Sequence, residues 1–414
     1  MERLRSLIGV VAILGIAWAL CPAERRRRVQ PKPVVAGLLM LVGFAILVLR
    51  TPLRGFFQIA NGVVDQLLGF TRQGSEFVFG SLVTDTKTFG FVLAFQVLPT
   101  ILFFAALTSV LYHLGVLPFV VRHIARFISR FLGTSGAETF STVADIFVGQ
   151  TEAPLTIRPY LAQMTDSELF ACMTAGFATT AGAVLAAYVA MLGPYIPDIA
   201  GHLVACSVMC APGGLAIAKL MMPEVGEPVT AGVRDIAVPR ETTNVLDAIA
   251  VGATDGLRLA ANVAAMLIVF LALTAMLNAG LGWVGGRIGM TLSLERLFAW
   301  VFSPLAWAMG VSSGDVGKVA TLLGQKTVLN EFVAYTAMSK ALAADPTWLS
   351  ERSRLIAAYA LCGFANFGSI GIQIGGYSAL EPSRRPDLSR LALRAMIAGM
   401  LTTCLVACVA AVIV

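Results

Sequence analysis

The sequence predicts an all-α polytopic membrane protein with about eight transmembrane helices, two re-entrant helical hairpins and an internal inverted repeat. Three observations indicate this fold class. The 414 residues are 57% hydrophobic and 13% charged, with a mean hydropathy of +0.81, far from the balance of soluble domains. Several apolar runs reach the roughly 18 to 25 residues that cross a hydrocarbon core about 30 Å thick. Two other apolar segments are interrupted by Gly, Pro and carboxylates.

Eight apolar runs predict the transmembrane helices in chain order. They cover residues 7–20, 34–49, 89–116, 169–191, 199–222, 259–281, 355–380 and 388–414. Segment 52–87, between the second and third runs, is amphipathic and interrupted by glycines. This pattern is typical of a helix that lies in the membrane interface, and a helix packed into the bundle fits it equally well.

Basic residues beside the first apolar run predict the orientation of the chain. Arg3 and Arg5 precede it, as in a secretory signal, but it lacks a convincing small-residue cleavage site, and Arg25 to Arg28 follow at once. Because Lys and Arg near helix ends stay in the cytoplasm, loop 24–32 is expected inside and both termini outside. The net charge of +6 is therefore interpreted as a topology signal, with no nucleic-acid partner.

Seven cysteines are scattered through apolar stretches. Cys206 and Cys210 are four residues apart and share a helix face, which allows a metal pair. His and carboxylate partners are missing nearby, so the preferred interpretation is small buried residues that let helices approach closely.

Two segments, 131–163 and 297–345, are predicted to be re-entrant hairpins, because non-helical backbone at membrane depth is tolerated only where protein buries it or water reaches it. Each is followed by an apolar run that contains Gly-Phe-Ala and a polar centre, at 176–182 and 363–369. Hairpin, broken helix and helix therefore occur twice. Such paired interruptions indicate a transport site at the bilayer midplane, although glycines also occur simply to allow tight helix packing.

The tip of the first hairpin carries Gln150, Thr151 and Glu152 ahead of Pro154, which favours a turn. An amide, a hydroxyl and a carboxylate together match the edge of a heterocycle that presents carbonyls beside an N–H. The alternative is that Glu152 forms a structural salt bridge with Arg158.

The second hairpin carries Glu331, and the second broken helix carries Asn366 and Ser369. A carboxylate, an amide and a hydroxyl facing one cavity suit the vicinal hydroxyls of a sugar. Asn366 is also expected to cap a half-helix, and both roles are compatible.

Four strings resemble those of the concentrative nucleoside transporters, and the likeness covers nearly the whole chain. They are GQTEAP at 149–154, SVMCAPGG at 207–214, NEFVAY at 330–335 and NFGSIG at 366–371. The resemblance implies a bacterial member in the inner (plasma) membrane, assembled as a homotrimer whose scaffold supports a mobile transport domain. It divides the chain into a first scaffold part (1–118), a first transport repeat (119–223), a second scaffold part (224–290) and a second transport repeat (291–414).

The resemblance also implies roles for particular residues. Four match positions that meet the nucleobase: Gln150, Thr151, Glu152 and Val184. Glu331, Asn366 and Ser369 match positions that meet the ribose, with Phe364 nearby. The family's sodium site falls on Asp145, Val148, Thr179 and Thr180. Similar transporters often have asparagine at position 145, so Asp145 departs from the pattern and either binds sodium more strongly or makes the proton the coupling ion.

The predicted function is a secondary active symporter that imports nucleosides, uridine-like pyrimidine nucleosides first, with a sodium gradient. No cofactor other than the coupling ion is expected. The alternatives are a proton-coupled symporter that uses Asp145 and, more distantly, a passive solute channel. The chain is not expected to be an enzyme, because it lacks paired His or Ser and Asp at catalytic spacing, and no phosphate-binding loop is present.

Overall fold

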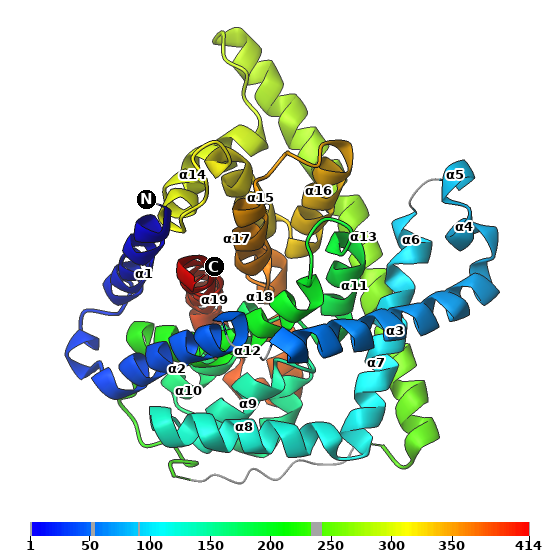
Figure 1. Ribbon diagram of the computed structural model, residues 1–414. Coiled ribbons are helices and arrows are strands. Elements are labelled where there is room, and N and C mark those ends of the chain that lie inside the picture. The colour runs from blue at the N-terminus through cyan, green and yellow to red at the C-terminus, as the bar shows by residue number, and fades with distance from the viewer. Residues whose placement is uncertain (1, 51–53, 90–91, 233–241, 414) are drawn as a thin grey trace.

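The structure is a computed structural model that describes residues 2–50, 54–89, 92–232 and 242–413. Within these ranges the chain is helical and contains no strand, which confirms the predicted all-α class. The first helices are α1 (Glu2–Ala19), η1 (Arg26–Arg28), α2 (Pro31–Arg50) and α3 (Arg54–Phe79). Helix α1 packs along α19, and α2 packs along α12 (Figure 1).

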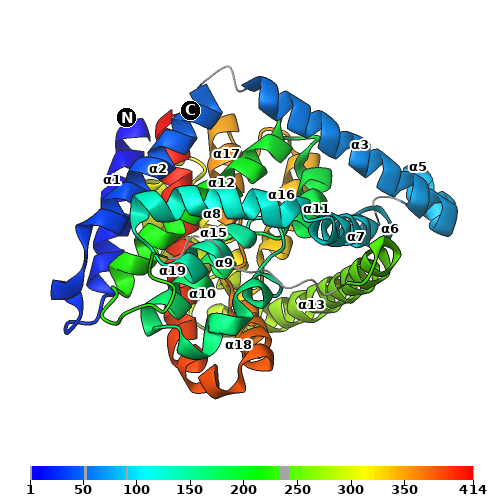
Figure 2. The ribbon, with the colours of Figure 1, turned by 90° about the horizontal axis from the view of Figure 1, so that it is seen from below.

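Helix α3 crosses one side of the bundle, where it packs against α12 and α7, and leads into three short helices (Figures 1 and 2). These are α4 (Ser81–Thr84), α5 (Thr86–Phe89) and α6 (Leu93–Gln96), and they are followed by α7 (Leu98–His113) and α8 (Val116–Leu132). The predicted run over 89–116 contains the membrane-length stretch Ala94–His113, and α8 is a further helix that none of the predicted runs covers. Gly115 takes a left-handed conformation, with φ 78°, and so separates α7 from α8.

The first repeat contains α9 (Gly136–Ala144), η2 (Ala153–Gln163), α10 (Asp166–Ala178), α11 (Gly182–Leu192) and α12 (Ile199–Met221). The long helix α13 (Val245–Arg287) and α14 (Leu294–Ala308) follow. The second repeat contains α15 (Val316–Val328), α16 (Glu331–Ala344), α17 (Glu351–Leu361), α18 (Phe367–Leu380), η3 (Pro382–Arg384) and α19 (Arg385–Ile413).

Six described helical stretches are long and apolar enough to cross a membrane. They are Pro31–Arg50, Ala94–His113, Asp166–Leu192, Ile199–Met221, Val245–Arg287 and Pro382–Ile413. The predicted run at 7–20 corresponds to α1, an 18-residue helix that includes Glu2, Arg3 and Arg5. The predicted run at 355–380 is divided into α17 and α18.

The second predicted hairpin, 297–345, is three helices rather than two. Helix α14 ends at a turn where Gly310 has φ 81° and lies against Ser6 of α1. The hairpin itself is α15 and α16, with 13 and 14 residues. At 1.5 Å per residue each is about 20 Å long, too short to cross a core of about 30 Å. Helix α9, with nine residues, is shorter still.

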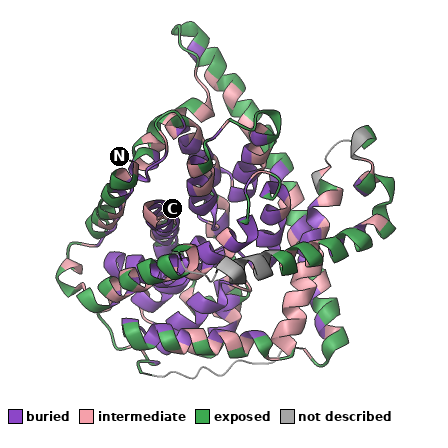
Figure 3. Cartoon of the chain, in the orientation of Figure 1, coloured by how far each residue is buried: buried purple, intermediate pink, exposed green. Residues whose placement is uncertain are grey.

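The core of the molecule lies where α10, α12, α17 and α19 pack together, and these helices are buried on most of their faces (Figure 3). Helices α7 and α13 pack along each other at one side, and α13 leaves most of its surface exposed. A helix of 43 residues is about 65 Å long, so α13 extends beyond the bundle (Figure 1).

The two broken helices meet at their breaks. The first break separates α10 from α11, and the second separates α17 from α18. Gly363 has φ 109° and lies directly against the backbone of Ala178, where a side chain would not fit. Its N–H donates to Thr180 Oγ1 at 2.9 Å. Both polar interruptions that the sequence predicts, 176–182 and 363–369, therefore contain a helix break, and the two breaks are in contact.

We expect Gly399→Ala to destabilise the protein. Gly399 of α19 lies against Phe177, immediately before the first break, and a methyl group there would clash with the Phe177 side chain and backbone. Overpacking of this kind costs about 1 to 3 kcal/mol. Thermal unfolding of the purified protein in detergent should show a lower midpoint than wild type.

Gly375→Ala is the matched control, because Gly375 is an exposed helical glycine with open space where the methyl group would go. It should leave the unfolding midpoint unchanged or slightly raised, since alanine favours helix. Equal midpoints for the two variants would contradict the tight packing of α19 on the break.

Candidate functional site

The tip of the first hairpin places an amide inside the protein. Helix α9 begins with a capping box formed by Ser135 and Glu138, and the chain turns after Ala144. Gln150 is 8% exposed, and its Nε2 donates to Ser369 Oγ at 3.5 Å. The Gln150 Oε1 atom accepts a hydrogen bond of 3.1 Å from Gln373 Nε2. The carboxamide of Gln150 is thus oriented by two residues of α18, in the other repeat.

The second hairpin places a carboxylate at the start of α16. Glu331 is 4% exposed and lies in the first turn of the helix, where the backbone N–H groups favour negative charge. Its Oε1 accepts from the Tyr188 hydroxyl at 2.9 Å, and its Oε2 accepts from Asn366 Nδ2 at 3.0 Å. Both carboxylate oxygens are therefore held by neutral donors.

Asn366 has both roles expected from the sequence context. Its Nδ2 contacts the Glu331 carboxylate, and its Oδ1 accepts from the backbone N–H of Ser369 at 2.8 Å, which caps α18. Ser369 in turn contacts Gln150. A continuous chain of hydrogen-bonded groups therefore joins Gln150 and Glu331 through the second broken helix, and Tyr188 of the first broken helix bonds to its Glu331 end.

The remaining predicted substrate residues differ in how exposed they are. Thr151 and Glu152 follow Gln150 and are exposed, whereas Val184 is buried in the first turn of α11 and Phe364 is half-buried in the second break. Glu152 and Arg158 do not form an ion pair with each other in the described structure, so the structural salt bridge considered from the sequence is absent.

The predicted cation residues include a buried carboxylate. Asp145 is 1% exposed, and neither of its oxygens has a hydrogen-bond partner among the described residues. Thr179 and Thr180 are buried at the break, and Val148 is half-buried in the hairpin turn. An unpaired carboxylate in such surroundings is costly, and a cation or a proton would relieve the cost. Hydroxyl and carboxylate oxygens are hard ligands, so these residues fit a sodium ion.

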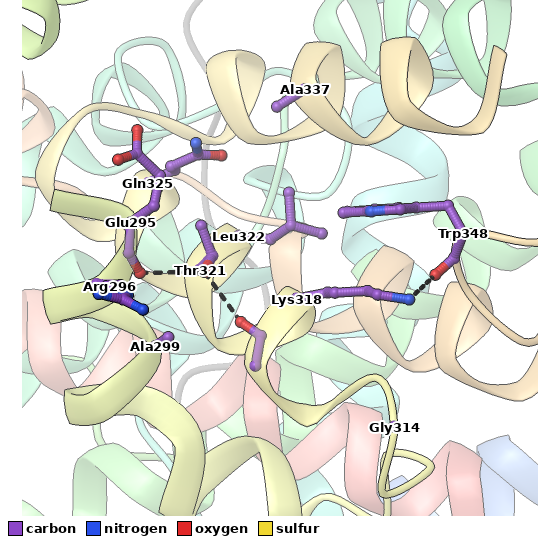
Figure 4. A pocket seen from close by; sticks show the side chains of 11 residues that line it. Glu295, Arg296, Ala299, Gly314, Lys318, Thr321, Leu322, Gln325, Ala337 and Trp348 are labelled. Carbon is purple, nitrogen blue, oxygen red and sulfur yellow. Dashed lines mark hydrogen bonds between the residues drawn. The ribbon is translucent and has the colours of Figure 1, made fainter. Parts of the chain in front are cut away.

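An open pocket of about 440 Å³ lies elsewhere, between α14, α15 and α16. Figure 4 shows Glu295, Lys318 and Trp348 at its wall, with Lys318 directed toward the Trp348 carbonyl. None of the predicted site residues lines it. Cys206 and Cys210 are buried, and the described residues contain no group of three or more His, Cys, Asp or Glu side chains placed for a metal.

Sequence reasoning missed two residues of the polar chain. Tyr188 holds Glu331, and Gln373 holds Gln150. Each lies four residues after a predicted site residue on the same helix, Tyr188 after Val184 and Gln373 after Ser369. Residues at this spacing share a helix face, so a search for polar side chains four residues after each predicted site residue would have identified both.

Comparison with known proteins identifies the family. A family model described as "Na+ dependent nucleoside transporter C-terminus" matches residues 202–411. A second, described as "Nucleoside recognition", matches 94–195, and the corresponding N-terminal model matches 8–82.

Individual relatives agree with this assignment. A transporter of Haemophilus influenzae is 42% identical over 99% of this chain and 97% of its own length. The sodium/nucleoside cotransporter 1 of Rattus norvegicus is 41% identical over 100% of this chain, which spans 64% of the rat protein.

The fold agrees as well. The structure of CNTnw in an inward-facing substrate-bound state is 41% identical, with a TM-score of 0.92 over 100% of this chain and 98% of that one. A variant of CNTnw in an outward-facing state matches with a TM-score of 0.93. The chain therefore belongs to the family of Na+-dependent, concentrative nucleoside transporters.

Proposed function

We propose that the chain is a secondary active symporter that imports nucleosides together with sodium ions. Membership of the family supports nucleoside transport. The observation that carries the proposal is the hydrogen-bonded chain from Gln150 through Ser369 and Asn366 to Glu331. It brings an amide and a carboxylate from opposite repeats to one place, which suits a solute with a heterocycle at one end and hydroxyls at the other.

In the proposed complex the two ends of the solute meet different hairpins. Gln150, with Thr151, Glu152 and Val184 beside it, meets the nucleobase, and we favour a uridine-like pyrimidine. Glu331, Asn366 and Ser369 meet the ribose hydroxyls, and the half-buried Phe364 ring lies nearby. The hydrogen bonds from Tyr188 and Gln373 fix the Glu331 and Gln150 side chains before the solute arrives, which lowers the entropy lost on binding.

The coupling ion is proposed to bind at Asp145, with Val148, Thr179 and Thr180. A positive charge there would neutralise the buried carboxylate and join the hairpin turn to the first break. One charge moving inward through 100 mV releases about 2.3 kcal/mol, enough to concentrate a neutral solute several tens of fold. A proton on Asp145 is the alternative, because it would neutralise the same carboxylate.

The proposed architecture is a homotrimer in the inner membrane, with both chain termini outside. Residues 1–118 and 224–290 form the scaffold, and residues 119–223 and 291–414 form the mobile transport domain. The contacts of α1 with α19 and of α2 with α12 then belong to the interface between the two. Solved structures of CNTnw in inward-facing and outward-facing states support alternating access.

Uptake into proteoliposomes tests the function directly. Radiolabelled uridine and adenosine would be offered under an inward sodium gradient, an inward proton gradient, or neither. We expect accumulation of uridine above its external concentration with sodium, and collapse of that accumulation when the gradient is dissipated. Accumulation with protons alone would indicate the proton symporter, and equal flux in both directions without accumulation would indicate a channel.

We expect Glu331→Gln to abolish uridine uptake while leaving the protein folded. The two oxygens of Glu331 each accept a hydrogen bond, whereas glutamine offers a single acceptor and no charge. Loss of a buried acceptor for a sugar hydroxyl should lower uptake by about 100-fold or more. Initial rates of uptake and the thermal unfolding midpoint would both be measured. Glu351→Gln, an exposed glutamate of α17, is the control and should transport normally. Wild-type uptake by the Glu331 variant would remove this residue from the site.

Asp145→Asn should change the ion dependence of transport more than the choice of nucleoside. Asparagine keeps the shape of the side chain but removes its charge, so the half-saturating sodium concentration should rise by about tenfold. If the proton is the coupling ion, the same variant should instead lose the pH dependence of uptake. The measurements are sodium titrations and pH profiles, together with the uridine-to-adenosine ratio. Unaltered sodium and pH profiles would exclude Asp145 from coupling.

A further inference from the structure

Lys326 is a buried lysine whose ammonium group is bound by uncharged oxygens. It lies in the last turn of α15 and is 0% exposed. Its Nζ donates to the Ala360 carbonyl at 2.8 Å, to Thr403 Oγ1 at 3.0 Å and to the Cys362 carbonyl at 3.4 Å. An ammonium group has three N–H donors, so these three oxygens take all of them.

The oxygens around Lys326 are the kind that bind a monovalent cation. Ala360 and Cys362 lie at the end of α17 and in the second break. The last carbonyls of a helix have no partner within it, and they carry the negative end of the helix dipole. Lys326 forms no ion pair with a carboxylate in the described structure. The hydrogen-bond partners of the ammonium group are therefore two peptide carbonyls and one hydroxyl.

Lys326 lies shortly before the glutamate of the second hairpin, as the predicted cation residues Asp145 and Val148 do in the first. Lys326 lies five residues before Glu331, in the hairpin, and Asp145 and Val148 lie seven and four residues before Glu152. In both repeats this stretch of the hairpin faces the break of the following helix, because Lys326 bonds to Cys362 and the Phe147 carbonyl accepts from the backbone N–H of Gly182.

The two positions are physically connected through the crossing of the breaks. Cys362 offers its carbonyl to Lys326, and its Sγ lies 3.6 Å from Thr180 Oγ1. The next residue, Gly363, donates its N–H to the same Thr180 hydroxyl. The Lys326 ammonium group therefore binds the same backbone segment, Cys362 and Gly363, that contacts Thr180 of the proposed cation site.

We propose that the Lys326 ammonium group is a tethered cation, which fills in the second repeat the position that a coupling cation fills in the first. The chain then needs one mobile cation per nucleoside, because the second position is permanently occupied by its own side chain. This inference rests on the proposed function for its account of stoichiometry, but the cation site itself can be tested without transport.

Removing the tether should create a site for a soluble cation. In Lys326→Ala the oxygens of Ala360, Cys362 and Thr403 keep their places and the space of the long side chain is vacated. In Lys326→Met the space stays filled and no charge or donor remains. The first variant can be rescued by a small monovalent cation and the second cannot. Lys318→Ala, on the same helix but partly exposed, is the matched control.

Sodium titrations of uridine uptake in proteoliposomes, with choline replacing sodium at constant ionic strength, give the first readout. Wild type and Lys318→Ala should show a Hill coefficient of about 1, and Lys326→Ala should approach 2 with half-saturating sodium raised by about tenfold. At high sodium the uptake of Lys326→Ala should recover, whereas Lys326→Met should stay inactive. A Lys326→Ala variant with the wild-type sodium curve, or a Lys326→Met variant that sodium rescues, would overturn the proposal.

Thermal unfolding in detergent gives a second readout that does not depend on transport. Sodium chloride, compared with choline chloride, should raise the midpoint of Lys326→Ala more than that of wild type, and it should do so even in combination with Asp145→Asn. No extra stabilisation, or failure of Lys326→Ala to fold even in high sodium, would show that a soluble cation cannot replace the ammonium group. If uptake by the wild-type protein did not depend on sodium, the proposed function would be contradicted. The effect of sodium on the unfolding of Lys326→Ala would still test the proposal about Lys326.

Discussion

The crossing of the two helix breaks is the contact on which the rest of the site depends. Gly363 has no side chain, so its backbone can lie against Ala178 and its N–H can reach Thr180. This approach places the end of one broken helix beside that of the other. The hairpin tips that face the breaks are thereby brought together, and Gln150 and Glu331 become members of one hydrogen-bonded chain. A residue with a Cβ at position 363 would separate them.

The polar groups of the site differ in how far the protein satisfies them. Glu331 has a donor for each oxygen, and Lys326 has an acceptor for each N–H. Asp145 has no partner for either oxygen in the described structure. Burying a charge without partners raises the free energy of the folded state, whereas burying fully hydrogen-bonded groups raises it little and holds them rigidly. The contrast separates groups whose hydrogen bonds the fold completes by itself from one whose hydrogen bonds it leaves open.

Much of the architecture could be predicted from local patterns. Hydropathy indicated a membrane protein, which the family confirms. The prediction that the chain is not an enzyme agrees with its membership of a transporter family. The interrupted segments 176–182 and 363–369 each contain a helix break, as predicted, although the first Gly-Phe-Ala is the last turn of α10. The second hairpin was drawn too long, because α14 is as apolar as a hairpin arm and only the turn at Gly310 against Ser6 separates it. Helix α8 was missed, because its apolar face merges with the preceding run at Gly115.

The sequence by itself determined the membrane fold, the two interruptions and the polar residues at the hairpin tips, because hydrophobicity, glycine and proline act on their own stretch of chain. Only the tertiary structure decided which groups meet. Tyr188 and Glu331 are 143 residues apart, and Gln150 and Gln373 are 223 apart, so no local pattern pairs them. Lys326 likewise looks like an ordinary helix-end lysine until α17 and α19 pack around it. Partners at such separations are selected by packing, which depends on the whole chain at once.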